Sequence, residues 1–162
     1  MTITNTSSAI LPAAGTWHLD KSHSSVEFQV RHLMVSKVKG SFDDFDAVIE
    51  IGETPEQSSV EATIQLASVN TGDAKRDEHL RSADFFNVDT NPVMTYKSRS
   101  VRPAGDGYQV DGDLTILGVT RPVTLDLEFN GVGSDPWGGT RAGFSASTEI
   151  SRKDFGREWH VA

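Results

Sequence analysis

Hydrophobic and polar residues alternate with a period of two along most of this chain, and a clear run covers residues 26–32. Val26, Phe28 and Val30 fall on one side of an extended chain, and His32 follows on the same side. Polar residues fall on the other side. Such alternation is typical of a strand with one apolar and one solvated face. The stretch 17–42 therefore predicts a first pair of strands, and later segments repeat its plan.

The same alternation returns in six later segments, which we predict to be strands. They are residues 45–51, 60–66, 93–101, 108–116, 123–129 and 142–150. Stretches rich in Gly, Pro, Asp and Ser separate most of these segments and have the composition of turns. These stretches are residues 52–58, 103–107, 117–122 and 131–139.

One segment, 70–86, breaks the period of two. Residues 74–81 are good helix formers without a β-branched side chain, and Thr71 or Asp73 can cap the start of a helix. We therefore predict one short helix, followed by the buried pair Phe85 and Phe86.

Seven or eight strands at such regular spacing suggest a sandwich or an up-and-down barrel. Short turns favour pairing between sequence neighbours, and a closed meander leaves no exposed sheet edge. A membrane barrel would turn its apolar face outward, but the polar faces here carry many free charges and no aromatic girdle is visible. We predict an all-β fold: an extended antiparallel β-barrel of about eight strands, apolar inside, with one short helix.

Charge and composition narrow the classes of partner. The 162 residues contain 15 Lys and Arg against 23 Asp and Glu, a net charge of −8, and no cysteine. Nucleic acids and anionic membrane surfaces require clustered basic residues, so we expect no binding to either. The absence of cysteine excludes disulfides, thiolate metal sites and a cysteine nucleophile. No apolar run is long enough for a spanning helix, so we expect a protein that does not span a membrane.

The first residues of the sequence differ from the rest in composition. Residues 1–15 contain no Lys or Arg, and their apolar residues are scattered among Thr, Ser and Asn. A secretory signal begins with positive charge and continues with a sustained apolar run. We interpret 1–15 as a flexible leader before a single domain over 16–162. We expect a cytoplasmic protein, or a periplasmic or secreted one if an upstream segment is missing from the sequence.

Small residues at inward-facing positions bear on whether the predicted barrel is filled. Ala47, Ala62, Gly112, Ala142 and Ala146 are too small to meet across the middle of an eight-stranded barrel. We therefore expect a narrow apolar tunnel that suits a chain-like lipid. Each buried methylene contributes about 0.8 kcal/mol. Association costs several kcal/mol, so useful affinity requires a long ligand or a few polar anchors at the mouth.

Several spaced motifs run in order along the chain from Trp17 onward. They are Trp17-x-Leu19-Asp20-x-x-His23-Ser24, Val38-x-Gly40-x-Phe42-x-x-Phe45, Thr71, Arg76-Asp77-x-His79-Leu80-x-Ser82-x-Asp84-Phe85-Phe86, Asn91-Pro92, Gly112-x-Leu114-Thr115-x-x-Gly118-Val119-Thr120 and Arg152-x-Asp154-Phe155-Gly156. In these motifs, which span nearly the whole chain, the sequence resembles the YceI-like family of lipid-binding proteins.

The resemblance implies a lipocalin-like barrel that holds a polyisoprenoid or a similar amphiphile such as an isoprenoid quinone, often as a homodimer. Many members carry a secretory signal, which we do not recognise in this sequence. Members usually continue past the Phe-Gly-x-x-Trp region into one further strand. We therefore expect either that the sequence is truncated after Ala162 or that the barrel closes without that strand.

The expected ligand, a long-chain isoprenoid lipid, would contact inward-facing residues of the barrel. The candidate ligand-binding residues are Phe28, Val30, His32, Phe42, Ile49, Ile64, Leu66, Phe86, Met94, Tyr96, Leu114, Ile116, Leu125, Leu127, Phe144 and Ala146. We predict no catalytic residue, no metal site and no cofactor beyond the bound lipid.

Some polar residues have a structural interpretation beside the functional one. His32 could bind a ligand head group, but a core histidine bound to a neighbour is the favoured interpretation. His23 and Ser24 stand where a strand begins and favour a role in fixing a turn.

The polar residues of the predicted helix allow two interpretations. Arg76, Asp77 and His79 could line a polar entrance to the barrel. An ion-paired lid that holds the helix on the barrel explains them equally well.

Enzymatic signatures are weak. The five histidines show no metal-site spacing, and 143–147 lacks the second glycine of a nucleophile elbow. We therefore expect a non-catalytic carrier. Two rival hypotheses stay open: a filled barrel that acts as a stress-response or interaction module, and an enzyme on an isoprenoid-like substrate with His32, Tyr96 or Arg152 as acid or base.

Overall fold

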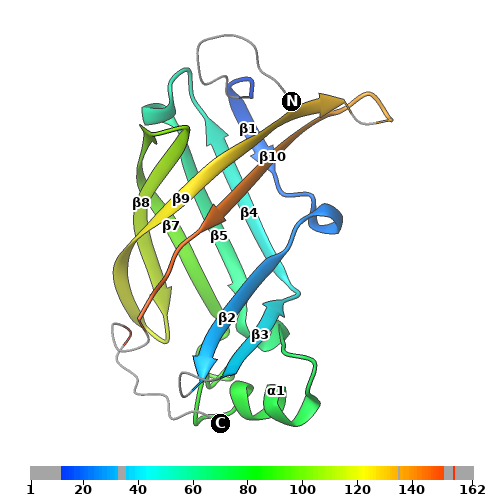
Figure 1. Ribbon diagram of the computed structural model, residues 1–162, viewed down its shortest axis with the longest axis vertical. Helices are drawn as coiled ribbons and strands as arrows, with labels where there is room; N and C mark the ends of the chain where they lie inside the picture. The colour runs from blue at the N-terminus through cyan, green and yellow to red at the C-terminus, as the bar shows by residue number, and fades with distance from the viewer. Residues whose placement is uncertain (1–11, 33–35, 135, 152–154, 156–162) are drawn as a thin grey trace.

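Antiparallel strands in two sheets make up most of the computed structural model, which describes residues 12–32, 36–134, 136–151 and 155 (Figure 1). The larger sheet has seven strands in the order β1-β4-β5-β7-β8-β9-β10, and the smaller has the order β2-β3-β6. The strands are β1 Gly15–His18, β2 Val26–His32, β3 Ser36–Phe42, β4 Phe45–Ile51, β5 Ser59–Gln65, β6 Val69–Asn70, β7 Val93–Ala104, β8 Gly107–Ile116, β9 Val119–Ser134 and β10 Thr140–Ser147.

One α-helix, α1 (Ala74–Arg81), follows β6, as the sequence predicts. Asp73 caps it by accepting hydrogen bonds from the backbone N–H groups of Lys75 and Arg76. Three short 3₁₀ turns complete the described elements: η1 Lys21–His23, η2 Pro55–Gln57 and η3 Leu66–Ser68. In Figure 1, α1 lies at one end of the molecule, and η2 lies with the β7–β8 turn at the other end.

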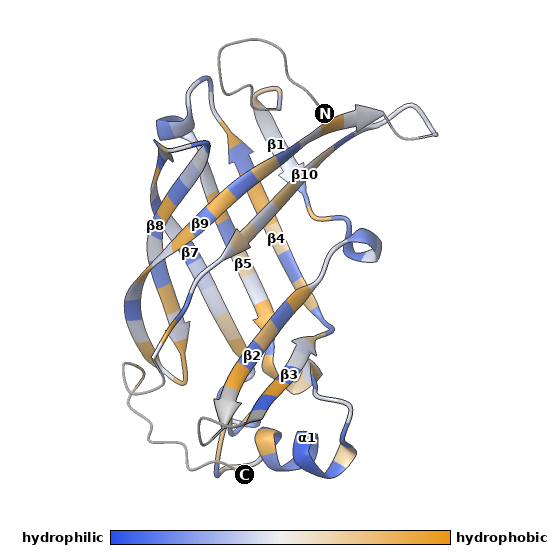
Figure 2. Cartoon of the chain, in the orientation of Figure 1, coloured by the Kyte–Doolittle hydropathy of each residue, from blue (hydrophilic) through white to orange (hydrophobic). Residues whose placement is uncertain are grey.

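The seven-stranded sheet curls into a half-barrel (Figure 1). Its strands β7 to β10 pair in sequence order, as expected for a meander, whereas β1 pairs with β4 across the inserted β2–β3 hairpin. Figure 2 shows the alternation of apolar and polar residues along these strands. The predicted all-β antiparallel fold with one short helix is confirmed, in the form of a half-barrel.

Two turns are tighter than the sequence predicts. The stretch 117–122, interpreted as a turn, contributes only Leu117 and Gly118, and Val119 already pairs with Ile116. Leu117 and Gly118 have φ values of 56° and 77°, the left-handed conformation that a two-residue hairpin requires. The predicted 103–107 loop likewise reduces to the two residues between Ala104 and Gly107.

Two β-bulges change which residues face the interior. The register of β7 against β8 shifts between Ser98 and Ser100, and that of β10 against β9 shifts at Gly143 and Phe144. An extra residue reverses the alternation beyond it. Tyr96 on one side of the β7 bulge and Val101 on the other are therefore both buried.

The apolar residues form two clusters in the half-barrel. The first covers the inner faces of β7, β8 and β9, and it includes Phe155, whose side chain is 2% exposed. The second lies between the small sheet, β5 and the segment after α1. Its buried members are Phe42, Leu66 and Val69, with Val26, Phe28, Ile64, Leu80, Phe86, Val88 and Met94 packed against them.

Candidate functional site

An apolar cavity of about 170 Å³ lies inside the half-barrel, in the half near η2. Its walls come from the inner faces of β4, β5, β7, β8, β9 and β10. The lining residues are Ile49, Ile51, Ser58, Ser59, Val60, Val101, Tyr108, Val110, Leu125, Leu127, Phe144 and Ala146. No Lys, Arg, His, Asp or Glu is among these described residues, so the cavity offers no charged partner to a ligand.

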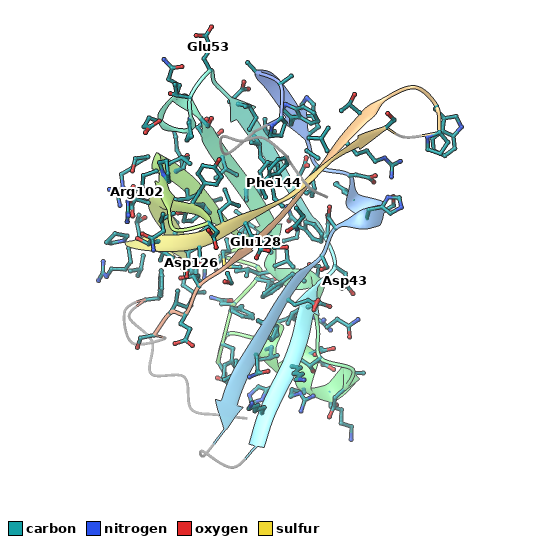
Figure 3. The ribbon with its side chains drawn as sticks, turned by 45° about the horizontal axis from the view of Figure 1, so that its top comes forward. Asp43, Glu53, Arg102, Asp126, Glu128 and Phe144 are labelled. Atoms are coloured by element: carbon teal, nitrogen blue, oxygen red, sulfur yellow. The ribbon has the colours of Figure 1, made fainter. Side chains whose placement is uncertain are left out.

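Strand β10 forms the wall of the cavity opposite β4. Phe144 packs against Phe129 of β9 with ring centroids 5.2 Å apart, and both rings belong to the inner face. The neighbouring β9 residues Asp126 and Glu128 are exposed on the other face, and Figure 3 labels them with Phe144. Ala146 lines the cavity but is exposed, so the cavity reaches the surface beside it.

Contacts between η1 and the start of β10 join two parts of the chain that are distant in sequence. Arg141 of β10 lies 3.4 Å from the Asp20 carboxylate and 3.3 Å from Nδ1 of His23. Hydrogen bonds from Ser22 and His23 lower the pKa of Asp20 to about 2. Ser24 donates to the Asp20 carbonyl, so the predicted turn-fixing role of His23 and Ser24 is confirmed.

The end of the half-barrel near α1 is filled by side chains. Phe28 and Phe42 pack with centroids 5.2 Å apart, and Phe42 and Phe86 with centroids 6.0 Å apart. Leu66 beneath them is fully buried. None of these residues is in the lining of the cavity, so the aromatic cluster and the cavity occupy different parts of the half-barrel.

Tyr96 is a core residue of the first cluster. Its hydroxyl donates toward the carbonyl oxygens of Val110 and Val123, at 3.1 and 2.9 Å. Burial, reinforced by the charge of Asp111, raises the pKa of Tyr96 to about 12. A neutral phenol that is already hydrogen-bonded is poorly suited to act as a base at neutral pH, which argues against the role that the enzyme hypothesis gave it.

Gly112 does not widen the interior, contrary to the sequence-based prediction. The Tyr96 ring occupies the space that a side chain at Gly112 would fill, since a β-carbon there would come within 2.6 Å of Tyr96 Cζ. The predicted open space at Gly112 is therefore wrong, and of the five small residues expected to leave space, Ala146 lines the described cavity.

The sixteen candidate ligand-binding residues fall into separate groups in the structure. Ile49, Leu125, Leu127, Phe144 and Ala146 line the cavity. The aromatic end holds Phe28, Phe42, Ile64, Leu66, Phe86 and Met94, and the first cluster holds Tyr96, Leu114 and Ile116. Val30 is half-buried on β2. The side chain of His32 lies outside the described residues, as does Arg152.

Seven residues line the cavity that the sequence does not single out as candidates. Val101 faces inward because of the bulge in β7, and the alternation of residues does not indicate this bulge. Tyr108 and Val110 follow the inward alternation of β8, and that pattern could have identified them. Ile51 and Val60 likewise continue the inner faces of β4 and β5, whereas Ser58 and Ser59 give no apolar signal.

Hydrogen bonds through Thr71 hold α1 in place. Asp77 is 8% exposed, and its carboxylate accepts from the N–H group of Thr71 at 2.9 Å and from its hydroxyl at 2.6 Å. Arg76 donates from Nε to Thr71 Oγ1 at 2.8 Å. His79 contacts Asp84 instead, at 3.3 Å. The contacts of Asp77 and Arg76 tie α1 to Thr71, the residue that follows β6, and His79–Asp84 ties it to the segment after the helix.

Metal-binding clusters and long apolar helices are both absent from the described part of the chain. It holds no group of three His, Cys, Asp or Glu side chains placed to bind a metal ion. None of its helices is long and apolar enough to cross a membrane.

Comparisons with known proteins bear on the family of this chain. A UPF0312 protein from Serratia proteamaculans is 46% identical over 159 residues, which cover 93% of this chain and 83% of the relative. The crystal structure of BcnA from Burkholderia cenocepacia superposes with a TM-score of 0.74 and 29% identity, covering 86% of this chain and 87% of that one.

A more distant structure has the same fold. A polyisoprenoid-binding domain from Saccharophagus degradans matches with a TM-score of 0.51 and 19% identity, covering 72% of this chain and 68% of that one. The model of the YceI-like domain matches residues 17–162. With these alignments and the half-barrel described above, the chain belongs to the YceI-like domain family.

Proposed function

We propose that this protein is a non-catalytic carrier that holds a long-chain amphiphile, a polyisoprenoid or an isoprenoid quinone, inside the half-barrel. The observation that carries the proposal is the apolar cavity of about 170 Å³ between β4 and β10. An uncharged cavity of this kind suits an apolar guest, because an ion would lose its hydration there without gaining a partner. The structural relative from Saccharophagus degradans, a polyisoprenoid-binding domain, supports the same class of ligand.

The size of the cavity limits what it can enclose. A cavity of about 150 Å³ holds one benzene molecule, so this cavity encloses one ring or a short stretch of chain and not a whole long lipid. The rest of the chain would follow the half-buried inner residues Leu125 and Leu127 toward the opening beside Ala146. Each enclosed methylene contributes about 0.8 kcal/mol before the cost of association is subtracted.

Extraction of the bound lipid tests the proposal. The purified protein is denatured and extracted with organic solvent, and the extract is compared by mass spectrometry with a mock purification. We expect a polyprenyl or quinone species in stoichiometric amount, whose mass gives the chain length and head group. An extract without lipid, both from the purified protein and after its incubation with polyprenols and quinones, would overturn the proposal of a lipid carrier. It would favour the hypothesis of a filled barrel that acts as an interaction module.

A further inference from the structure

The half-barrel ends in two edge strands, β1 and β10, which are the first and last in the order of the larger sheet. Residues that line the apolar cavity lie beside both edges. The pairing partners of β1 include Ile49 and Ile51 of β4, and both line the cavity. Strand β10 itself contributes Phe144 and Ala146 to the lining. The boundary between β1 and β10, which we call the seam, therefore borders the cavity on both sides.

Contacts between side chains join the two sides of the seam, where the described strands do not pair. Arg141 of β10 lies 3.4 Å from the carboxylate of Asp20, which follows β1. It also lies 3.3 Å from Nδ1 of His23. The Asp20 carboxylate accepts hydrogen bonds from the hydroxyl and the N–H group of Ser22, at 2.7 and 3.1 Å. Asp20 therefore presents a fixed anion to β10.

A glycine pair separates this end of β10 from its cavity-lining part. Gly131 of β9 pairs with Gly143 of β10, and the register shifts directly after this pair, between Gly143 and Phe144. Gly131 has a φ of 123°, a conformation that residues with a side chain rarely adopt. Beyond the glycines, residues 131–134 and 140–143 pair only with each other among the described strands, and they form an arm (Figure 1). A two-stranded arm without a third strand bends most easily at such a point.

We propose that the arm is a gate, latched by Arg141 on Asp20, and that the guest enters and leaves the cavity through the seam when the latch opens. The pair is suited to a reversible latch, since Arg141 and Asp20 are 42% and 41% exposed and exposed ion pairs contribute little to stability. The aromatic cluster of Phe28, Phe42 and Phe86 blocks the alternative route past α1. The inference rests on the proposed carrier function and adds to it the route of exchange and the contact that sets its rate.

A cross-link across the latch tests the gate on the full chain. The chain has no cysteine, so Asp20→Cys and Arg141→Cys introduce the only two thiols, and a short bismaleimide joins them. Farnesene, an apolar probe, is added to the protein or diluted from it, and the bound amount is followed in time after rapid gel filtration. We expect the cross-link to slow uptake and release by about tenfold or more while the amount bound at equilibrium stays the same, because a gate controls passage and not affinity.

Glu61→Cys with Lys97→Cys is the matched control. Glu61 and Lys97 form an exposed ion pair at 3.6 Å on the paired strands β5 and β7, away from the seam. Their cross-link should leave uptake and release unchanged. Both double variants should bind the same amount of farnesene as the wild-type protein before they are cross-linked, which checks that the substitutions themselves leave the cavity intact.

Ionic strength gives a second readout. Asp20→Asn keeps the side-chain oxygen that accepts from Ser22 but removes the charge that attracts Arg141. It should speed uptake by about two- to fivefold, the value of an exposed ion pair. Salt should speed uptake in the wild-type protein because it screens the same pair, and this response should disappear in Asp20→Asn. Glu61→Gln, which breaks an ion pair away from the seam, should retain the response.

The outcomes separate the gate from the carrier function. If the wild-type protein binds no farnesene at equilibrium, the carrier proposal fails and the gate fails with it. If it binds farnesene and the cross-link between positions 20 and 141 leaves both rates unchanged, the carrier stands and the gate is wrong. A cross-link that lowers the amount bound at equilibrium without slowing release would show that the arm is part of the binding site and not a gate.

Discussion

The ring of Tyr96 lies over Gly112, which pairs with Ser98 of β7, and fills the space that a side chain at Gly112 would occupy. A β-carbon at Gly112 would come within 2.6 Å of both Cζ and Oη of Tyr96. The same β-carbon would lie 2.6 Å from the carbonyl oxygen of Lys97. The absence of a side chain at Gly112 therefore lets the tyrosine cross β8 and reach the carbonyl of Val123 on β9.

Gly112→Ala should lower the free energy of unfolding by about 1–3 kcal/mol, the usual cost of overpacking. Urea denaturation measures the change. Gly133→Ala is the matched control, because Gly133 also lies in a strand and a β-carbon there would meet no described atom within 4 Å. The control should change the free energy of unfolding by less than about 0.5 kcal/mol. Equal losses in the two variants would show that the Tyr96 contact is not the cause.

Removing the two tyrosine hydroxyls should have different effects on stability. Tyr96→Phe leaves the carbonyls of Val110 and Val123 without their donor and should destabilise the ligand-free protein by about 0.5–1.5 kcal/mol. Tyr108→Phe removes an unpartnered hydroxyl and should leave the stability unchanged or raise it. Urea denaturation of both variants after delipidation provides the comparison. A larger loss in Tyr108→Phe would mean that its hydroxyl has a partner in the folded protein.

Sequence reasoning succeeds where the signal is local. The sequence predicts the helix at 74–81 with its true bounds, because the Asp73 cap and the helix-forming residues act within a few positions of each other. It also predicts the strand at 45–51 with its true bounds, since alternation directly reports which face is buried.

The rest depends on contacts between distant segments. The bulge at Ser98 and Ser100 brings Val101 inward, and no residue type in this segment indicates a bulge. The sequence suggests open space at Gly112 because it does not show that Tyr96 covers this position. The unpartnered hydroxyl of Tyr108 is a property of the assembled interior. These three features of the candidate site depend on tertiary contacts, which the alternation of residues does not show.

The hydrogen bonds between Thr71 and Asp77 predict a stability effect at α1. Asp77→Asn places an amide where the carboxylate accepts from the N–H and hydroxyl groups of Thr71, and it should cost about 1.5–3 kcal/mol. Hydrogen exchange should show faster exchange of the α1 amides in this variant. Glu78→Gln, an exposed change on the same helix, is the control and should leave exchange unaltered. Unchanged protection in Asp77→Asn would mean that packing alone holds the helix.

Asp111 should make stability depend on pH under acidic conditions. Its carboxylate accepts hydrogen bonds from Arg102 and Thr124, which lower its pKa to about 2. Because the folded-state pKa lies below the unfolded value, this contribution is complete above about pH 4 and is lost as the pH falls toward 2. Urea midpoints measured across this range should fall less steeply in Asp111→Asn than in the wild-type protein.

The β7–β8 turn provides the control for this titration. Asp106→Asn changes an exposed carboxylate whose side chain makes no hydrogen bond among the described residues. Its acid profile should follow that of the wild-type protein. If Asp111→Asn also follows the wild-type profile, the hydrogen bonds from Arg102 and Thr124 to Asp111 do not contribute to the loss of stability in acid.

Blocking the mouth of the cavity should separate ligand binding from folding. Ala146 lines the cavity from β10 and is exposed, so Ala146→Trp can place its ring across the opening with little overpacking of the core. We expect uptake of farnesene to fall at least tenfold while the circular dichroism spectrum and urea midpoint stay close to those of the wild-type protein. Ser147→Trp, one residue along on the other face of β10, adds the same bulk outside and should bind normally. A folded Ala146→Trp protein with normal uptake would place the lipid elsewhere.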